Sequence, residues 1–428
     1  MNSIDEKKAL APWTESLPPD WKSIRLDAVA DVLFSNVDKH TIEGEQPVRL
    51  CNYVDVYNNE RITAALDFME ASAGPREIEK FQVYRHDVLA TKDSEEPDDI
   101  AIAALVAEDL PGVLCGYHLA MMRPRSERVH GPFIAWAHAS KQFRAQYEAK
   151  AVGVTRFGLS QYAFRAASLP LPPLPEQKLI ATYLDATCAA IDVAMAAKQR
   201  QIEILDALQG SAISLALTRG LTPGVKLKAS GERWLGDIPR HWAIKRIKDI
   251  ADLRSGEGIA AEDIAPVGEF PVYGGNGLRG YTSSFTHDGH FPLIGRQGAL
   301  CGNINYASGK FWATEHAVVV TPLPPCDTLW LGELLRVMNL NQYSNAAAQP
   351  GLAVDRLKFL RLPVPPSEEQ TIIAQHNRDV MQRTAQLKRQ LGEQLNTLTA
   401  YRNSLIHECV TGQRRLTEAE IKRVQAHG

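Results

Sequence analysis

Two short stretches decide the architecture: residues 171–177 read LPPLPEQ, and residues 364–370 read VPPSEEQ. Each precedes a long run with helical patterning, and these runs close with SAISLALTRG (211–220) and SLIHECVTGQ (404–413). The offset is constant, because 370 − 177 and 404 − 211 both give 193. An internal repeat of this kind indicates one supersecondary scaffold used twice.

A second repeat precedes each half of the first. WTESLPPDW (13–21) matches WLGDIPRHW (234–242) at an offset of 221 residues. The regions between these repeated motifs do not resemble each other. Repeated motifs separated by dissimilar regions predict a protein with an internal pseudo-twofold repeat, in which one scaffold holds two different recognition domains.

The composition is that of an ordinary globular protein, with 45% hydrophobic and 23% charged residues. Its 428 residues predict two to four domains. No stretch approaches the roughly 20 apolar residues of a membrane helix. The charged N-terminus, MNSIDEKKALAPW, has no apolar core of the kind that a signal peptide needs.

The cysteines and the net charge bear on the cellular location of the protein and on how it could bind nucleic acid. The six cysteines are scattered without a CxxC pair, which indicates reduced thiols and a cytoplasmic location. A net charge of −3 argues against a purely electrostatic coat for nucleic acid. Local basic patches, or partners that supply positive charge, stay compatible with it.

The first variable region, about 21–169, predicts an α+β domain. Turn-forming clusters such as DSEEPDD (93–99) separate its strand-like runs, and residues 140–150 read as a helix. The strand-like runs are VRLCNYVDVY (48–57), FQVYRHDVLAT (81–91), IAIAALV (100–106) and GYHLAMMRP (116–124).

The second variable region, about 242–362, is rich in glycine and aromatic residues. Residues 270–285, 292–307 and 310–322 predict strands joined by tight glycine turns, and DTLWLGELLRVMN (327–339) predicts a helix.

Each repeated proline run introduces a long helix. From Glu176 to about Arg219 no proline interrupts the pattern, so we expect about 44 helical residues, roughly 65 Å long. Its apolar positions recur at three- and four-residue steps, with Lys198 and Gln209 as interruptions. They are Leu184, Cys188, Ile191, Met195, Ile202, Leu205 and Ala212, matched in the second copy by Met381, Leu391, Leu395, Leu398 and Leu405. The simplest way to bury both stripes is an antiparallel pair within the chain; a seam for another protein or a homodimer is the alternative.

These motifs together resemble the specificity subunit of type I restriction-modification enzymes. The doubled PLPPLPEQ-type junction, the long helix after it and the closing SLI…VTG segment carry the resemblance. TKDSEEPDDIA (91–101) with CGYHLA (115–120) is similar to one lineage of that family's target recognition domains. PVYGGNGLRGYTSSF (271–285) with GRQGALCGNINYASGKFWATEHAVVV (295–320) is similar to another.

The resemblance implies a non-catalytic subunit that reads a two-part sequence in double-stranded DNA. It implies two modification (methyltransferase) subunits and restriction/translocase subunits as partners, and no membrane. S-adenosylmethionine and ATP with Mg²⁺ are then expected in the partners, with no cofactor in this chain. The expected domains are target recognition domains at 1–170 and 221–363, each followed by a spacer helix, at 171–220 and at 364–428 with the C-terminal tail.

Catalytic motifs are absent or out of context. Gly275-x-Gly277-x-x-Gly280 has the spacing of a dinucleotide fingerprint, but YTSSF follows it where a helix is needed, so we interpret these as turn glycines. There is no Gly-x4-Gly-Lys-Ser/Thr phosphate loop and no Asp/Asn/Ser-Pro-Pro-aromatic motif. Pro97-Asp98 with Glu148 and Lys150 only loosely imitates a nuclease site, and the twelve histidines show no metal spacing.

The remaining candidates are for recognition. Arg pairs with guanine, and Asn or Gln with adenine, from rigid loops. In the second domain the candidates on glycine-rich turns are Tyr273, Asn276, Arg279, Arg296 and Gln297. Ordinary polar loop residues are the alternative interpretation.

In the first domain, Lys92 and Asp93 end a strand before the acidic SEEPDD loop. That loop would repel phosphates, so it either accepts a cytosine amino group or caps the fold. Candidate phosphate contacts, which position without encoding sequence, are Arg61, Lys80, Arg123, Lys141, Arg144 and Arg156. Solvated surface charge is the alternative for each.

The repeated junction has two possible roles. A proline stop with helix-start chemistry would account for it structurally. Alternatively, two equal surfaces could dock two equal modification subunits. The docking candidates are Pro172, Pro173, Glu176, Gln177, Pro365, Pro366, Glu369 and Gln370. Two rival functions stay open: a stand-alone DNA methyltransferase or nuclease, and a coiled-coil adaptor that does not bind DNA.

Overall fold

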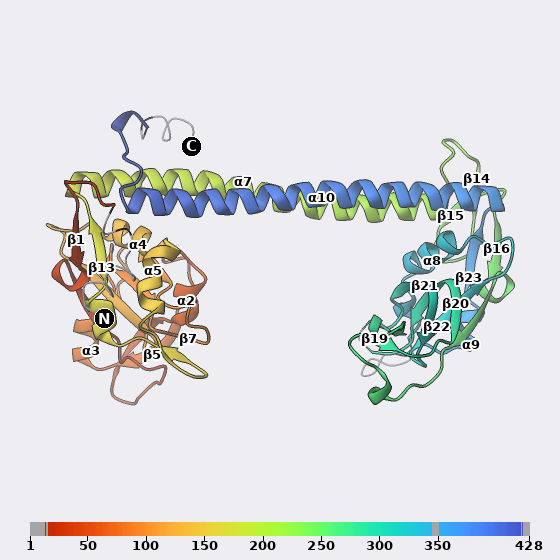
Figure 1. Ribbon diagram of the computed structural model, residues 1–428, viewed down its shortest axis with the longest axis horizontal. Coiled ribbons are helices and arrows are strands. Elements are labelled where there is room, and N and C mark those ends of the chain that lie inside the picture. Colours follow the sequence, from red (N-terminus) through yellow and green to blue (C-terminus); the bar gives the residue numbers. More distant parts are fainter. Residues whose placement is uncertain (1–12, 14–15, 299, 345–350, 421, 423–428) are drawn as a thin grey trace. The chain divides into compact units, whose positions relative to one another are not determined.

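The computed structural model describes residue 13 and residues 16–298, 300–344, 351–420 and 422. The charged N-terminal stretch discussed above lies mostly outside them. The chain divides into two compact units, shown in Figure 1: unit 1 comprises residues 1–198 and 393–428, and unit 2 comprises residues 199–392. Each unit therefore contains one globular head and parts of both long helices.

The head of unit 1 is a mixed α+β domain. In chain order its elements are β1 (Lys22–Arg25), β2 (Ala30–Phe34), β3 (Gln46–Cys51), α2 (Tyr53–Tyr57), β4 (Arg61–Ile62), β5 (Met69–Ala73), α3 (Pro75–Phe81), β6 (Val88–Thr91), β7 (Asp93–Ser94), β8 (Ala103–Val106), β9 (Val113–Cys115), β10 (Leu119–Pro124), α4 (Gly131–Ala139), α5 (Lys141–Glu148), β11 (Val152–Gly153), β12 (Phe157–Gly158), α6 (Gln161–Arg165) and β13 (Ser168–Leu171).

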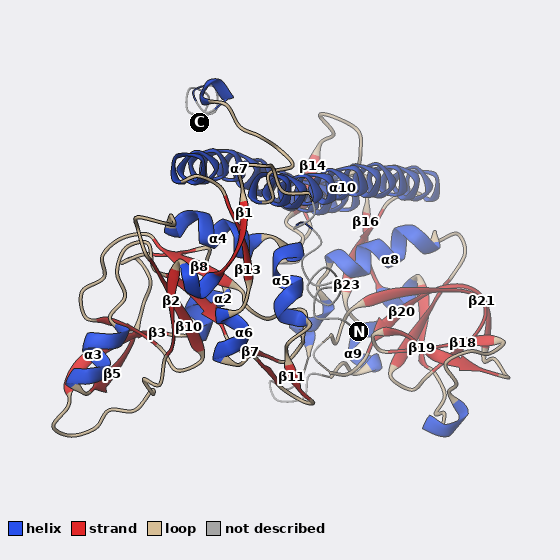
Figure 2. Ribbon diagram, turned by 60° about the vertical axis from the view of Figure 1, so that its left-hand side comes forward, coloured by secondary structure: helices blue, strands red, loops and turns tan. Residues whose placement is uncertain are grey.

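Its main sheet has the strand order β2-β10-β6-β8-β4, antiparallel except for the parallel pair β4 and β8. The central strand β6 is buried on both faces, as its VLAT sequence suggests. Figure 2 shows α4 lying between the long helices and this sheet. Phe133 on α4 belongs to the core that this layering encloses.

Two strand predictions in this head are partly wrong. Of residues 48–57, only the first part is a strand, because Asn52 begins helix α2 and its backbone N–H is bound by Asp55 at 2.7 Å. Of residues 81–91, only β6 is a strand. The stretch before it is a turn in which the Asp87 carboxylate accepts from the Tyr84 N–H at 3.0 Å.

The head of unit 2 has its own complete set of elements. They are β14 (Leu227–Ala229), β15 (Asp237–Pro239), β16 (Ala243–Arg246), β17 (Ala251–Ser255), β18 (Phe270–Gly274), β19 (Gly277–Thr282), β20 (His287–Gly295), β21 (Ile304–Ala313), β22 (Ala317–Pro322), α8 (Thr328–Val337), α9 (Val354–Lys358) and β23 (Arg361–Val364).

Unit 2 repeats the topology of unit 1 although the sequences differ. Its sheet runs β17-β22-β20-β21-β18-β19, again antiparallel except for the parallel pair β18 and β21. The first five strands thus follow the same order and directions as in unit 1. Each head is also anchored by one short antiparallel pair that ends at the proline run, β1 with β13 and β16 with β23.

The two long helices are α7 (Leu174–Arg219, 46 residues) and α10 (Ser367–Val410, 44 residues). In unit 1, α7 and α10 meet antiparallel, since Lys198 contacts Gln394 at 2.6 Å and Asp192 contacts Arg402 at 3.0 Å. The apolar seam there is buried, with Leu184, Cys188, Ile191 and Leu405 in one cluster.

In unit 2 the same two helices again run antiparallel. Asp206 pairs with Lys388 at 2.6 Å, and Ile213 and Leu217 share a cluster with Ile373. The predicted fold class is therefore confirmed: two globular α+β domains and a pair of long antiparallel helices, in an internal repeat.

The expectation that no stretch of the chain approaches the apolar length of a membrane helix is wrong for α7. Among the described residues, this single helix is long and apolar enough to cross a membrane by length and composition. Its many alanines raise the average hydropathy without giving it a uniformly bulky apolar surface. A helix packed lengthwise against a partner helix passes the same test, and α7 is packed against α10 in both units.

Candidate nucleic-acid interface

The repeated Glu-Gln pair at the start of α7 fastens the head of unit 1 to the helix. Trp21 donates from Nε1 to Glu176 at 3.0 Å. Gln177 is fully buried; its Oε1 accepts from the backbone N–H of His130 at 2.8 Å, and its Nε2 donates to the Pro172 carbonyl at 2.9 Å. Because His130 caps α4, one side chain joins the proline run, α7 and α4.

The start of α10 repeats this junction in unit 2. Trp242 donates to Glu369 at 3.0 Å. Gln370 is buried and accepts from the backbone N–H of Asp327, the N-cap of α8, at 2.9 Å. Its Nε2 donates to the Pro365 carbonyl, also at 2.9 Å. The doubled PP…EQ motif is therefore one structural joint built twice.

The C-terminal end of the opposite helix completes each joint. In unit 2, α7 ends at Gly220 (φ 74°), where an added Cβ would lie 3.2 Å from Trp242 and 2.9 Å from Glu369. In unit 1, α10 is followed by Gly412 (φ 75°), where a Cβ would lie 3.3 Å from Trp21. Glycine allows both the left-handed turn and the close packing on tryptophan. All the repeated motifs thus meet at one place in each unit.

The eight docking candidates differ in accessibility, and the pattern is the same in both copies. Pro172, Gln177, Pro365 and Gln370 are buried; Glu176 and Glu369 are half-buried; Pro173 and Pro366 are exposed. The buried members can affect a docking partner only by shaping the surface. Docking itself stays a prediction for all eight.

The two joints differ in the cation that faces the glutamate. Arg415, from the tail after α10, contacts Glu176 at 2.9 Å and Asp20 at 2.8 Å. In the second joint His241 contacts Glu369 at 2.8 Å. The two joints therefore share their hydrogen bonds but differ in the residue that faces the glutamate, an arginine in one and a histidine in the other.

In the head of unit 1, three of the recognition candidates lie together. Asp93 accepts from Arg156 through Oδ1 and contacts His118 Nδ1 through Oδ2 at 2.8 Å. Lys92 donates to the Ser35 carbonyl at 3.2 Å. Burial lowers the pKa of Lys92, and the neighbouring Asp93 opposes that shift. The cluster occupies the end of central strand β6, where the strand gives way to loops.

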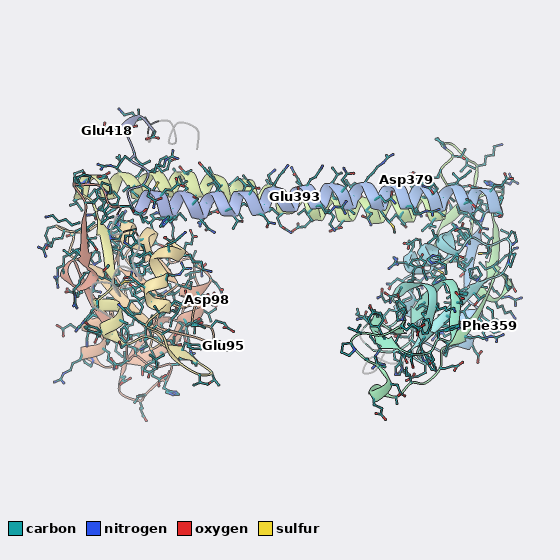
Figure 3. The ribbon with its side chains drawn as sticks, in the orientation of Figure 1. Glu95, Asp98, Phe359, Asp379, Glu393 and Glu418 are labelled. Carbon is teal, nitrogen blue, oxygen red and sulfur yellow. The ribbon has the colours of Figure 1, made fainter. Side chains whose placement is uncertain are left out.

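An open pocket of about 250 Å³ adjoins this cluster. It is lined by Arg156, Ser94, Glu95, Asp99, Tyr53 and Tyr57. Figure 3 shows Glu95 and Asp98 at the surface of the same acidic loop. Carboxylates and tyrosine hydroxyls make this wall rich in hydrogen-bond acceptors, which suits an exocyclic amino group of a base better than a phosphate.

Two other candidate cations in this head bind carboxylates of the chain itself. Arg61 contacts Asp185 on α7 at 2.6 Å. Arg123 contacts the buried Asp87 at 2.8 Å. Each therefore supports the fold in this structure, and a phosphate contact by either one stays a prediction.

The remaining cations differ in exposure. Arg144 donates to the carbonyl of His138 at 2.8 Å and so closes the end of α4; burial lowers the pKa of Arg144. Lys141 and Lys80 are exposed on α5 and α3. Their role as phosphate contacts is likewise untested.

In the head of unit 2, the glycine-rich candidates lie on the β18–β19 hairpin. Asn276 is exposed in its turn and Arg279 is exposed on β19, while the ring of Tyr273 packs on Phe311 at 5.8 Å. Gly277 (φ 98°) makes the hairpin turn possible. The interpretation of the Gly-x-Gly-x-x-Gly spacing as turn glycines is only partly right, because Gly275 lies in the turn whereas Gly277 begins β19 and Gly280 lies within it. No helix follows the glycines, so the dinucleotide context is missing.

The hairpin lies beside the end of central strand β20. A Cβ added to Gly295 would collide with the carbonyl oxygen of Gly275. Arg296, the next residue, donates to Ser255 Oγ and to the Leu352 carbonyl, both at 3.3 Å. Gln297 is exposed. The structure therefore places the five candidates of this head on the β18–β19 hairpin and just after the end of β20, with Tyr273 and Arg279 on strands where turns were predicted.

Sequence reasoning missed two histidines in these clusters. His118 faces Asp93 in unit 1, and His316 accepts from the Arg296 N–H through its backbone carbonyl in unit 2. No sequence signal marks them, since the two heads do not align. Within the described part of the chain, no group of three or more His, Cys, Asp or Glu side chains could hold a metal ion.

Comparison with known proteins gives a consistent result. The family model for the type I restriction modification DNA specificity domain matches residues 18–204 and 239–397. The EcoprrI specificity subunit of Escherichia coli is 48% identical over 134 residues, 30% of this chain and 33% of that protein. A putative specificity subunit of Haemophilus influenzae is 32% identical over 109 residues, 25% of this chain and 28% of that protein. The chain thus spans about a third or less of these curated relatives.

Solved structures share the fold over nearly the whole length. A chain from work on complex assembly and conformational transition of the type I R-M system has a TM-score of 0.74 at 18% identity, covering 92% of this chain and 98% of that one. The HsdS subunit from Thermoanaerobacter tengcongensis has a TM-score of 0.56 at 19% identity, covering 93% and 98%.

Proposed function

Since this chain belongs to the family of type I restriction modification DNA specificity domains, we propose that it is the DNA sequence-specificity subunit of a type I restriction-modification complex. Each head reads one half of a two-part target in double-stranded DNA. The observation that supports this most is the repeated joint and sheet topology carrying different loop residues in the two units.

The proposed division of labour follows the repeat. Target recognition domains occupy residues 1–170 and 221–363; spacer helices occupy residues 171–220 and, with the tail, 364–428. Two modification subunits dock at the two joints, with Pro173 and Pro366 as the exposed contacts, and restriction/translocase subunits join that assembly in the cytoplasm. The chain itself is non-catalytic, and the partners supply the methyl-transfer and ATP-dependent chemistry.

The helical pair sets the distance between the half-sites. At about 1.5 Å per residue, α7 is roughly 69 Å long, close to two turns of B-DNA at about 34 Å each. Removing one heptad from α7 and the facing heptad from α10 keeps the seam in register. The unread gap in the recognised sequence should then shorten; an unchanged gap would refute the spacing role.

A stand-alone methyltransferase is the first rival. Incubating the purified chain with DNA and labelled S-adenosylmethionine tests it directly. We expect no transfer until the modification subunits are added. Robust transfer by the chain alone would overturn the non-catalytic assignment.

A coiled-coil adaptor that does not bind DNA is the second rival. Gel shifts with and without the modification subunit discriminate, because the adaptor predicts no sequence preference in either case. We expect a preference in the complex, with affinity that falls as salt rises. The net charge of −3 predicts weaker binding by the isolated chain.

A further inference from the structure

The two heads share an equivalent position at the end of their central strands. In unit 1 the last pair of β6 and β10 joins Thr91 with Leu119. In unit 2 the last pair of β20 and β22 joins Gly295 with Ala317. The chain just after the first strand of each sheet matches as well. The Ser35 N–H donates to the Leu119 carbonyl, and the Gly256 N–H donates to the Ala317 carbonyl.

One residue further on, both heads carry a cation and a histidine joined through the backbone. The Lys92 N–H donates to the His118 carbonyl at 3.2 Å, and the Arg296 N–H donates to the His316 carbonyl at 2.9 Å. Both cations also donate to a group at the end of the first strand of their sheet. Lys92 donates to the Ser35 carbonyl, and Arg296 donates to the Ser255 hydroxyl. Two heads without sequence resemblance have thus placed the same residue types at the same site.

Each histidine side chain lies beside a carboxylate, although the ring nitrogen that faces it differs between the two heads. His118 Nδ1 contacts Asp93 at 2.8 Å, and His316 Nε2 contacts Glu315 at 3.1 Å. The side chains are 32% and 42% exposed. A carboxylate on one ring nitrogen fixes the orientation of the imidazole.

The other ring nitrogen is available in each case. His118 Nε2 and His316 Nδ1 have no hydrogen-bond partner among the residues described. Core histidines of this protein behave differently: the buried His138 uses both ring nitrogens within the fold. An exposed imidazole with one nitrogen held and one free is suited to donate to an acceptor outside the chain.

We infer that His118 and His316 are DNA-contacting residues, each donating from its free ring nitrogen to an acceptor on DNA in the half-site that its own head reads. This inference rests on the proposed function. The acceptor is an oxygen or nitrogen that can accept from an imidazole N–H, either guanine N7 or O6 or a phosphate oxygen. Lys92 and Arg296 contact the same stretch of DNA beside them.

The test uses the full chain in complex with its modification subunits. Preferred sequences are selected from a random duplex library with the wild type, His118→Gln and His316→Gln, and affinities are measured at several salt concentrations. His40→Gln serves as the control, since His40 also faces a carboxylate, that of Asp38 at 3.6 Å, but lies outside the cluster. Thermal unfolding of each variant separates a binding effect from misfolding.

We expect His118→Gln and His316→Gln to weaken binding about 5- to 100-fold, the worth of a good base contact, with the control unchanged. If guanine is the acceptor, discrimination relaxes at one position, in opposite halves for the two variants. If phosphate is the acceptor, affinity falls for all sequences and the salt slope drops by about one.

Two results would overturn the inference. Wild-type sequence preference, affinity and salt slope in both variants would exclude a DNA contact. Losses matched by equal loss of thermal stability would show a purely structural role. A wild-type complex that selects no two-part sequence would instead defeat the proposed function, and the inference with it.

Discussion

The joint at the start of α10 predicts a large cost for a small substitution. Gln370→Leu removes an amide while keeping the side-chain volume nearly the same. Gln370 is 3% exposed and provides the partners for the Asp327 N–H and the Pro365 carbonyl, both at 2.9 Å. After the substitution the buried Pro365 carbonyl and the half-buried Asp327 N–H have no protein partner among the described residues.

The magnitude follows from those two groups. A buried donor or acceptor left unsatisfied costs about 1–3 kcal/mol. Two groups would cost about 2–6 kcal/mol, and because the Asp327 N–H is only half-buried we expect a loss of about 2–5 kcal/mol in the free energy of unfolding. Because Asp327 is the N-cap of α8, the loss should be concentrated where α8 meets α10. The amide of Asp327 should lose hydrogen-exchange protection by about tenfold for each 1.4 kcal/mol.

The assay is urea unfolding followed by tryptophan fluorescence, with hydrogen exchange as the local readout. Gln375→Leu is the matched control: the same change, five residues along the same helix, at an exposed side chain whose one side-chain hydrogen bond among the described residues goes to Asp379 at 2.8 Å. The control should cost less than about 0.5 kcal/mol. Equal effects of the two substitutions would refute the role assigned to the repeated glutamine.

Three further predictions concern the free energy of unfolding, each measured by urea titration. Trp21→Phe keeps the aromatic bulk but removes the 3.0 Å bond to Glu176, and should cost about 1.5–3 kcal/mol; no loss would mean that this bond is dispensable. Asn377 is buried, and neither of its side-chain polar atoms has a partner among the described residues. Asn377→Leu, which copies Leu184 at the 193-residue offset, should therefore stabilise by about 1–3 kcal/mol, and a loss of stability would point to a hidden partner. Burial lowers the pKa of His138 from 6.5 to about 4, so below pH 6.5 the unfolded chain binds a proton that the folded protein excludes. Stability should be fully present above that pH and fall by about 2 kcal/mol by about pH 5, whereas His138→Gln should flatten this dependence; an equally steep fall in the variant would assign it to other groups.

The long helices could be predicted from the sequence because the repeat displays them twice. A proline run, an uninterrupted apolar stripe and a closing glycine mark the start and end of each one, and α7 begins within two residues of the predicted Glu176. The antiparallel pairing also follows, since two stripes in one chain bury each other most simply that way.

Local capping was harder to see in the sequence. The run VRLCNYVDVY has strand-forming residues throughout, but the Asp55 carboxylate accepts from the Asn52 backbone N–H and a helix begins in its middle. A strand pattern and a short capped helix use the same aromatic and branched residues there, so propensity alone cannot separate them.

The candidate site was predicted by residue type, and its organisation was not. The sequence predicts Lys92 at the end of a strand and Arg296 on a glycine-rich turn, and in the structure the two occupy equivalent positions beside His118 and His316. The equivalence of the two positions follows from the shared sheet topology. It cannot be recognised in the two sequences, because they do not align. The burial of Gln177 could not be predicted either, because its hydrogen-bond partner His130 lies 47 residues away in the sequence.

The central claim is that two heads on one repeated frame read two parts of one DNA site. Sequencing that detects methylated bases, applied to the host genome with and without this gene, tests it most directly. The account predicts methylation of a two-part sequence with a constant unread gap, present only when the gene is intact. A methylation pattern that does not change with the gene, or a single uninterrupted target, would contradict it.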